Sequence, residues 1–156
     1  MPFNQLNVQE NVPLRHLTTF SIGGPARYYL KAKEPDDIIQ AWRAARRQEI
    51  PIFLLGGGSN ILVSDRGFGG LVIHVATEGI TTVGENKSSV TLKVAAGENW
   101  DRFVARAVAA GWWGIENLSL IPGSVGAVPI QNVGAYGKES INVVKAVRSG
   151  IQKPEK

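Results

Sequence analysis

Three consecutive glycines, followed by a serine and an asparagine at residues 56–60, are the residues best suited to ligand binding. Glycine has no Cβ, so its backbone reaches conformations closed to other residues and lets a ligand approach the main-chain N–H groups. Successive exposed N–H groups form a concave anion site, and Ser59 and Asn60 add side-chain donors. We therefore interpret residues 56–60 as a phosphate-binding loop, with a tight turn between two buried strands as the alternative.

The residues after this loop restrict the kind of nucleotide site it could form. Residues 61–63 are apolar and a turn-forming cluster follows at residues 65–70, so we expect a strand after the glycines. A Rossmann motif needs a third glycine where Ile61 stands and a helix after it. A P-loop needs a lysine and a serine or threonine that are absent there. Both motifs are excluded for this loop.

A second glycine-rich stretch, residues 114–137, has five glycines and two prolines and yet is not polar. Apolar side chains alternate in it with small residues and amides. An irregular backbone that is buried must satisfy its N–H and C=O groups, either within the protein or with a ligand that has a flat polar edge. We expect a flavin ring to fit this description, because its pyrimidine edge needs such partners and its faces need apolar cover.

Residues 1–75 are expected to form one α+β unit that presents the glycine loop at a strand end. Residues 1–11 are polar, and we expect them to be loose at their start. Beyond Pro35, which suits a first helical turn, apolar side chains recur at helical spacing. The expected elements are a short strand and turn over 17–25, a strand over 26–32, a helix from Pro35, and strands over 52–55, 61–63 and 71–75.

Residues 76–156 are expected to form a second, incomplete α+β unit. Asn99 is a good helix N-cap and Gly111 a good helix stop. We expect strands over 81–83 and 90–95, a helix over 99–110, the start of a strand over 143–148, a turn at 149–150 and a polar tail over 151–156. The apolar face of that helix, which we expect to be core, consists of Trp100, Phe103, Val104, Ala107 and Val108.

The composition of the 156 residues excludes several classes of protein. Hydrophobic residues make up 44% and charged residues 19%, which excludes a disordered chain. No apolar run approaches the roughly 20 residues of a membrane span, and no signal-peptide pattern is present, so we expect a cytoplasmic protein without a membrane partner. With no cysteine and only His16 and His74, we expect no metal site. The net charge is +4, but only Arg43, Arg46 and Arg47 cluster, at a predicted helix end, so we expect no nucleic-acid partner.

The quoted residues closely resemble the UDP-N-acetylenolpyruvoylglucosamine reductase family of peptidoglycan synthesis. Residues 55–60 are similar to its pyrophosphate loop, and residues 19–24 to its opening segment. The resemblance continues over residues 116–126, 129–132 and 134–137, in the family's order. It implies an α+β FAD-binding domain of the vanillyl-alcohol-oxidase type, with FAD between two α+β subdomains. Non-covalent attachment is expected, because the chain has no cysteine and neither histidine lies in these motifs.

The resemblance implies an FAD-dependent oxidoreductase that makes UDP-N-acetylmuramate. NADPH reduces the FAD, and hydride from flavin N5 goes to C3 of the enolpyruvyl group of a UDP-sugar substrate. A serine then protonates C2, while an arginine and a glutamate stabilise the developing charge. By resemblance, the pyrophosphate-binding residues are Gly56, Gly57, Gly58, Ser59 and Asn60, and the flavin-side residues are Asn117, Ser119, Ile121, Pro122, Gly123, Ser124, Gly126, Gln131, Asn132, Gly134 and Tyr136.

The catalytic arginine, serine and glutamate of the family belong to segments without a counterpart in this sequence. We therefore assign no catalytic residue to the chain and expect it to be inactive alone. A fragment of a longer enzyme or a truncated product is expected. The alternative function is a non-catalytic module that binds FAD or another nucleotide.

Overall fold

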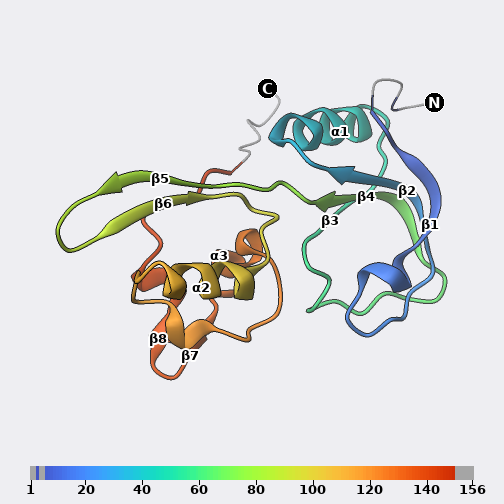
Figure 1. Cartoon of the computed structure of the whole chain (residues 1–156). Helices are drawn as coiled ribbons and strands as arrows, with labels where there is room; N and C mark the ends of the chain where they lie inside the picture. Colours follow the sequence, from blue (N-terminus) through green and yellow to red (C-terminus); the bar gives the residue numbers. More distant parts are fainter. Residues whose placement is uncertain (1–2, 4–5, 150–156) are drawn as a thin grey trace.

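The computed structural model describes residue 3 and residues 6–149, and its first group of elements is a four-stranded mixed sheet with one helix (Figure 1). The helix α1 (Pro35–Arg47) connects β2 to β3, and a 3₁₀ helix, η1 (Leu14–Leu17), follows β1. Strand β1 is antiparallel to β2, whereas β4 is parallel to both β2 and β3. The strand order is β1 (Gln9–Pro13), β2 (Pro25–Ala32), β4 (Phe68–Val75) and β3 (Ile52–Leu55).

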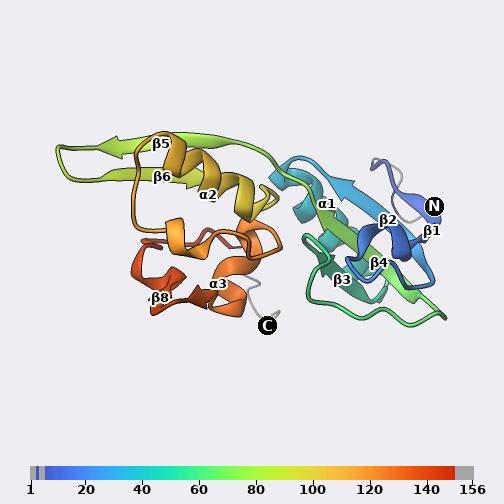
Figure 2. The same ribbon diagram turned by 60° about the horizontal axis from the view of Figure 1, so that its bottom comes forward.

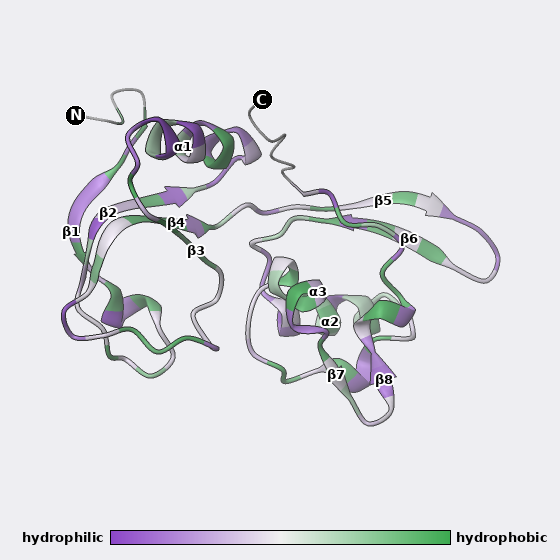
Figure 3. Ribbon diagram, turned by 180° about the vertical axis from the view of Figure 1, so that it is seen from behind, coloured by the Kyte–Doolittle hydropathy of each residue, from purple (hydrophilic) through white to green (hydrophobic). Residues whose placement is uncertain are grey.

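Helix α1 forms as predicted from Pro35 and packs on one face of the sheet. The Asp37 carboxylate accepts hydrogen bonds from the N–H groups of Lys33 and Glu34, both at 3.0 Å, and so closes a capping box. The ribbon of α1 alternates between hydrophilic and hydrophobic residues, as expected of a helix with one buried side (Figure 3). The core on this face contains Ala41, Ala44 and Ala45 of α1 with Leu30, Ala32, Leu71 and Ile73 of the sheet.

Residues 61–63, predicted as a strand, form no strand in the structure. Ile61 and Val63 are instead partly buried against the other face of the sheet, where they pack on the second core cluster. Gly23 allows this approach, because a Cβ there would lie 2.8 Å from the Cβ of Val63. The apolar residues thus cover the sheet without pairing with it, and the strand prediction was wrong. The second core cluster contains Leu14, Ala26, Tyr29, Leu55 and Val72.

The second group of elements begins with a hairpin of β5 (Ile80–Glu85) and β6 (Val90–Val94), followed by α2 (Trp100–Ala109). The side chain of Asn99 accepts a hydrogen bond from the N–H of Arg102 at 2.9 Å, which confirms the predicted N-cap. Figure 2 shows α2 beside the hairpin. The chain continues through η2 (Glu116–Leu118), η3 (Val125–Ala127), α3 (Val128–Gln131), β7 (Gly134–Ala135), β8 (Lys138–Glu139) and η4 (Ser140–Asn142).

Helix α2 is held to these short elements by a core cluster around Trp100. The indole Nε1–H of Trp100 donates a buried hydrogen bond of 2.8 Å to the carbonyl of Leu118. Phe103 is partly buried against the cluster, but Val108 is 37% exposed, so its predicted core position was wrong. The cluster contains Trp100, Val104, Leu118, Val128 and Val133, and Ala107 is also buried.

Other differences from the sequence-based prediction lie near the two ends of the chain. Strand β1 occupies residues 9–13, where no strand was predicted. Residues 17–24 contain the end of η1 and turns, not a strand, and residues 143–148 form no strand. Strand β1 lies at the sheet edge with most side chains exposed, so no hydrophobic alternation marks it. The tail predicted over 151–156 and Gly150 of the predicted turn lie outside the described residues.

Over residue 3 and residues 6–149, no helix has both the length and the apolar character required to cross a membrane.

A hydrogen-bonded pair of ionisable side chains lies within the first sheet. The Tyr29 hydroxyl and His74 Nδ1 are 2.7 Å apart, and Tyr29 is 6% exposed. Burial, followed by the positive charge of Lys31, lowers the pKa of His74, and burial raises the pKa of Tyr29. His74 pairs across the strands with Leu55, the residue before the glycine loop. The pair therefore belongs to the sheet end from which that loop leaves.

We expect His74 to make the protein less stable in mild acid. Because its folded-state pKa is below 6.5, the unfolded chain takes up the proton first as the pH falls, and stability decreases from about pH 6.5 downward. Urea denaturation at pH 7.5 and pH 5.5 should show a smaller loss of stability for His74→Gln than for the unchanged protein. An equal loss in both proteins would contradict this assignment.

Candidate functional site

The glycine loop, residues 56–60, directly follows β3. Strands β2, β4 and β3 are parallel, so their carboxyl ends meet at the sheet edge from which this loop leaves. Ligands of open parallel sheets bind outside such carboxyl ends. Among the described residues, none accepts a hydrogen bond from the main-chain N–H groups of residues 57–60. These groups remain available as donors to a ligand.

Gly58 fixes the loop against the segment that follows η1. It has φ +67°, and a Cβ there would lie 1.9 Å from the carbonyl oxygen of Leu17. Its own carbonyl accepts a hydrogen bond of 3.0 Å from the N–H of Thr19. Only glycine fits a left-handed position with a backbone atom this close. The segment over residues 19–24, singled out in the sequence, therefore supports the glycine loop.

Gly56 and Gly57 face the second glycine-rich stretch. A Cβ on Gly57 would lie 3.0 Å from the Cα of Gly123, and a Cβ on Gly56 would lie 2.7 Å from Ser124 Oγ. A Cβ on Gly123 would in turn lie 3.4 Å from Ser59 Oγ. Figures 1 and 2 both draw the loop after β3 beside the loop before η3. The two stretches selected separately from the sequence therefore lie against each other.

This contact revises the reason for the glycines. From the sequence, we expected the missing side chains to allow the approach of a ligand. In the structure, the space beside Gly56, Gly57 and Gly58 contains protein atoms of Ser124, Gly123 and Leu17. The glycines thus allow three segments of the chain to approach closely. The availability of N–H groups in the loop to a ligand is independent of this packing role.

The second stretch is held by main-chain hydrogen bonds to the residues before α2. The N–H of Trp100 donates to the carbonyl of Gly123 at 3.1 Å, and the N–H of Val125 donates to the carbonyl of Glu98 at 2.9 Å. Gly126 donates to the carbonyl of Ala96 at 2.8 Å, and a Cβ on Gly126 would lie 2.7 Å from the Cβ of Ala96. The start of α2 therefore fixes the position of residues 123–126.

Asp101, which is not among the site residues predicted from the sequence, lies in the first turn of α2 and holds residues 119–120 of the stretch. Its Oδ1 accepts hydrogen bonds from the N–H of Leu120 at 2.6 Å and from the hydroxyl of Ser119 at 2.8 Å. The bond from Leu120, followed by that from Ser119, lowers the pKa of Asp101. An acidic residue after an N-cap predicts only a helix start, so the sequence did not reveal this second role.

Three non-glycine residues of the second stretch have left-handed backbones. The φ angles are 62° for Leu120, 43° for Asn132 and 52° for Tyr136. Such residues cost roughly 1–3 kcal/mol each and are concentrated at functional sites. Leu120, Ile130 and Tyr136 are 84%, 85% and 90% exposed, so their apolar surfaces are not part of the core. Strain and exposed apolar surface thus occur together in this stretch.

The remaining predicted site residues are Asn117 on η2, Ile121 and Pro122 between η2 and η3, Gln131 on α3 with Asn132 just after it, and Gly134 on β7 with Tyr136 just after it. Asn117 is exposed on η2, which begins at Glu116. The N–H of Gly114 donates to the Glu116 carboxylate at 2.5 Å and lowers its pKa. Within the described part of the chain, no hydrogen bond joins Asn117 or residues 131–136 to residues 56–60. The contacts with the glycine loop described above involve residues 123–124.

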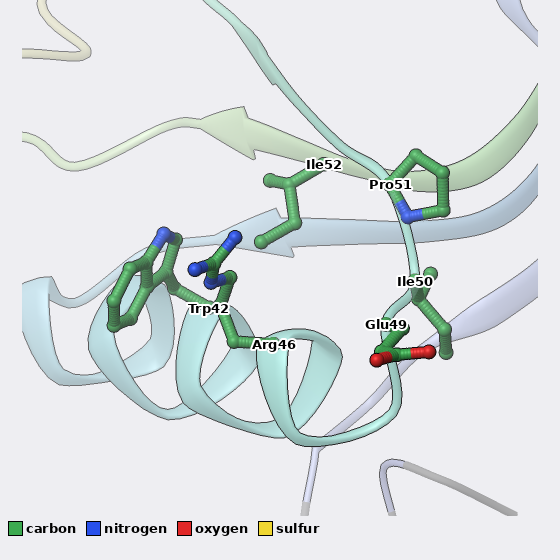
Figure 4. Close-up of a pocket in the computed structure, with 6 residues that line it drawn as sticks. All are labelled: Trp42, Arg46, Glu49, Ile50, Pro51 and Ile52. Carbon is green, nitrogen blue, oxygen red and sulfur yellow. The ribbon is translucent and has the colours of Figure 1, made fainter. Parts of the chain in front are cut away.

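A separate depression lies at the C-terminal end of α1 (Figure 4). Trp42 and Arg46 of α1 line one side, and the Arg46 guanidinium carbon is 5.9 Å from the centre of the Trp42 ring. Residues 49–52 complete it. None of its residues belongs to the predicted site.

Residues 26–149 match the FAD binding domain family, and the chain belongs to that family. The mixed α/β fold with an FAD-binding domain is thus confirmed, whereas the division into subdomains at residues 75 and 76 stays a prediction.

The chain is homologous to UDP-N-acetylenolpyruvoylglucosamine reductase. It is 46% identical over 140 residues to that enzyme from Cutibacterium acnes, a match covering 90% of this chain and 37% of the relative. It is 50% identical over 134 residues to the enzyme from Streptomyces coelicolor, a match covering 85% of this chain and 34% of the relative. The crystal structure of the enzyme (MurB) from Thermus caldophilus matches with a TM-score of 0.64 and 30% identity, over 86% of this chain and 45% of that one. The chain thus spans less than half the length of these relatives.

Proposed function

We propose that the chain is the FAD-binding portion of an NADPH-dependent reductase that converts UDP-N-acetylglucosamine enolpyruvate to UDP-N-acetylmuramate in peptidoglycan synthesis. The contact of Gly57 with Gly123 supports this function most directly, because it joins the two stretches that resemble the cofactor-binding motifs of that family. The relatives carry the name of this reductase, and the matched family is an FAD binding domain.

The residues present fit FAD as a ligand. The free N–H groups of residues 57–60, together with the side chains of Ser59 and Asn60, would bind the pyrophosphate. Residues 119–126 would bind the flavin end, with their main chain held by the start of α2. The exposed apolar side chains of Leu120, Ile130 and Tyr136 would cover the cofactor or the substrate and exclude water.

When bound, FAD supplies the hydride chemistry of the reaction, and NADPH is the proposed reductant. This chain contributes binding and orientation. Ser119 and Ser124 match cofactor-side positions of the family, and the hydroxyl of Ser119 already donates a hydrogen bond to Asp101. We therefore assign neither serine the role of proton donor to the substrate. A cytoplasmic location is proposed with the same function.

We expect the purified chain to bind FAD without a covalent bond. Titration should perturb the flavin absorption spectrum, and FAD should stay with the protein during desalting and be released on denaturation. The physical reason is the set of N–H donors on residues 57–60 beside residues 123–124. An unperturbed spectrum together with no retention would overturn the proposed function and the alternative FAD-binding module alike.

If FAD binds, NADPH and the enolpyruvyl substrate distinguish the reductase from a non-catalytic module. The relatives are more than twice as long as the matched part. The experiment should therefore use two proteins: the chain alone, and the chain fused to the remaining part of a relative. Anaerobic reoxidation of the flavin that depends on the substrate would support the reductase. Flavin binding without such reoxidation in either form would support the module.

A further inference from the structure

We propose that Asp101 is a positioning residue for the cofactor site. Its carboxylate holds Ser119 and Leu120 in the backbone conformation that binds the flavin. This inference rests on the proposed function. Asp101 lies on α2, outside both glycine-rich stretches. It therefore acts through the residues it binds.

The geometry gives the carboxylate two partners in consecutive residues. Oδ1 accepts the main-chain N–H of Leu120 at 2.6 Å and the hydroxyl of Ser119 at 2.8 Å. Hydrogen bonds to a charged acceptor are shorter and stronger than neutral ones. Three residues later, Gly123 contacts Gly57 of the glycine loop. A change at Leu120 would therefore extend to the contact between the two stretches.

Leu120 needs such support because its own side chain does not provide it. The residue has φ 62°, a left-handed conformation that is unfavourable for leucine. Its side chain is 84% exposed, so packing does not hold it there. The hydrogen bond to Asp101 holds the backbone at this position. Without it, we expect residues 119–121 to relax to an ordinary backbone conformation.

The same bonds favour the ionised form of the Asp101 carboxyl group. The N–H of Leu120, then the hydroxyl of Ser119, lowers the pKa of the carboxyl group. The group is thus ionised at neutral pH, and its support is lost only in acid.

The test is the dissociation constant of FAD, measured by flavin fluorescence for the unchanged chain and its variants. We expect Asp101→Ala to weaken binding by about 10-fold, as the loss of a charge-assisted hydrogen bond would. Asp101→Asn, which keeps an acceptor oxygen, should restore much of the affinity. In a Leu120→Gly background, where the left-handed backbone costs little, Asp101→Ala should lose most of its effect.

Asp37→Ala is the matched control. Asp37 also lies in the first turn of a helix and accepts two main-chain hydrogen bonds, both at 3.0 Å, but it caps α1. Its replacement should lower the melting temperature without changing the affinity for FAD. The comparison separates support of the site from support of a helix.

Hydrogen exchange of the Leu120 amide provides a readout without cofactor. Exchange should accelerate in Asp101→Ala and not in Asp37→Ala; equal exchange would overturn the positioning role. Unchanged FAD affinity in Asp101→Ala, with the parent chain binding FAD, would overturn the inference alone. Failure of the parent chain to bind FAD would overturn the proposed function and, with it, the link between Asp101 and the flavin.

Discussion

Gly58→Ala is expected to destabilise the protein by at least about 3 kcal/mol. Alanine at φ +67° is strained, and its Cβ would lie 1.9 Å from the carbonyl oxygen of Leu17. The loop, η1 or both must move, and the hydrogen bond from Thr19 to the carbonyl of Gly58 would be lost. Thermal unfolding followed by circular dichroism should show a melting temperature lower by roughly 6–12 °C, given about 2–4 °C per kcal/mol at this size.

Gly69→Ala is the matched control for this change. Gly69 is an exposed glycine of β4, and a Cβ there would have no neighbouring atom within 4 Å. Its replacement should change the free energy of unfolding by no more than about 0.5 kcal/mol. If Gly58→Ala were as mild as Gly69→Ala, the close contact between the glycine loop and Leu17 would be wrong.

Gly57→Val is expected to weaken FAD binding by about 100-fold or more while leaving the chain folded. Gly57 is exposed, but a Cβ there would lie 3.0 Å from the Cα and 3.1 Å from the carbonyl carbon of Gly123. The larger valine side chain would force the two glycine-rich stretches apart. A displacement of about 1 Å in a positioned site can cost a factor of about 100. Flavin fluorescence titration measures the affinity, and circular dichroism checks the fold.

Gly84→Val is a suitable control, because a Cβ on Gly84 would make only an ordinary contact, 3.8 Å from the Cβ of Thr91. Gly84 lies in the β5 and β6 hairpin, away from the glycine loop. We expect the Gly84→Val variant to bind FAD with the same affinity as the parent chain. Full affinity in Gly57→Val would show that the contact with Gly123 is not part of the cofactor site.

The sequence by itself determined the elements whose signals are local. Helix α1 follows from Pro35 and the apolar spacing after it, and α2 follows from Asn99 as N-cap and Gly111 as stop. The resemblance of residues 55–60 and 116–137 to a reductase family was sufficient to indicate an FAD-binding domain, which the family match confirms. Each of these signals lies within a short segment, so no tertiary contact was needed to detect it.

The tertiary structure decided which distant segments meet. Residues 61–63 have the composition of a strand, but Ile61 and Val63 instead pack on the face of the sheet beside Gly23. Strand β1 forms because β2 offers it a pairing edge, although its own side chains are mostly exposed. The contact of Gly57 with Gly123 and the bond from Leu120 to Asp101 join residues 66 and 19 positions apart. Such pairings depend on the path of the whole chain, which no local pattern contains.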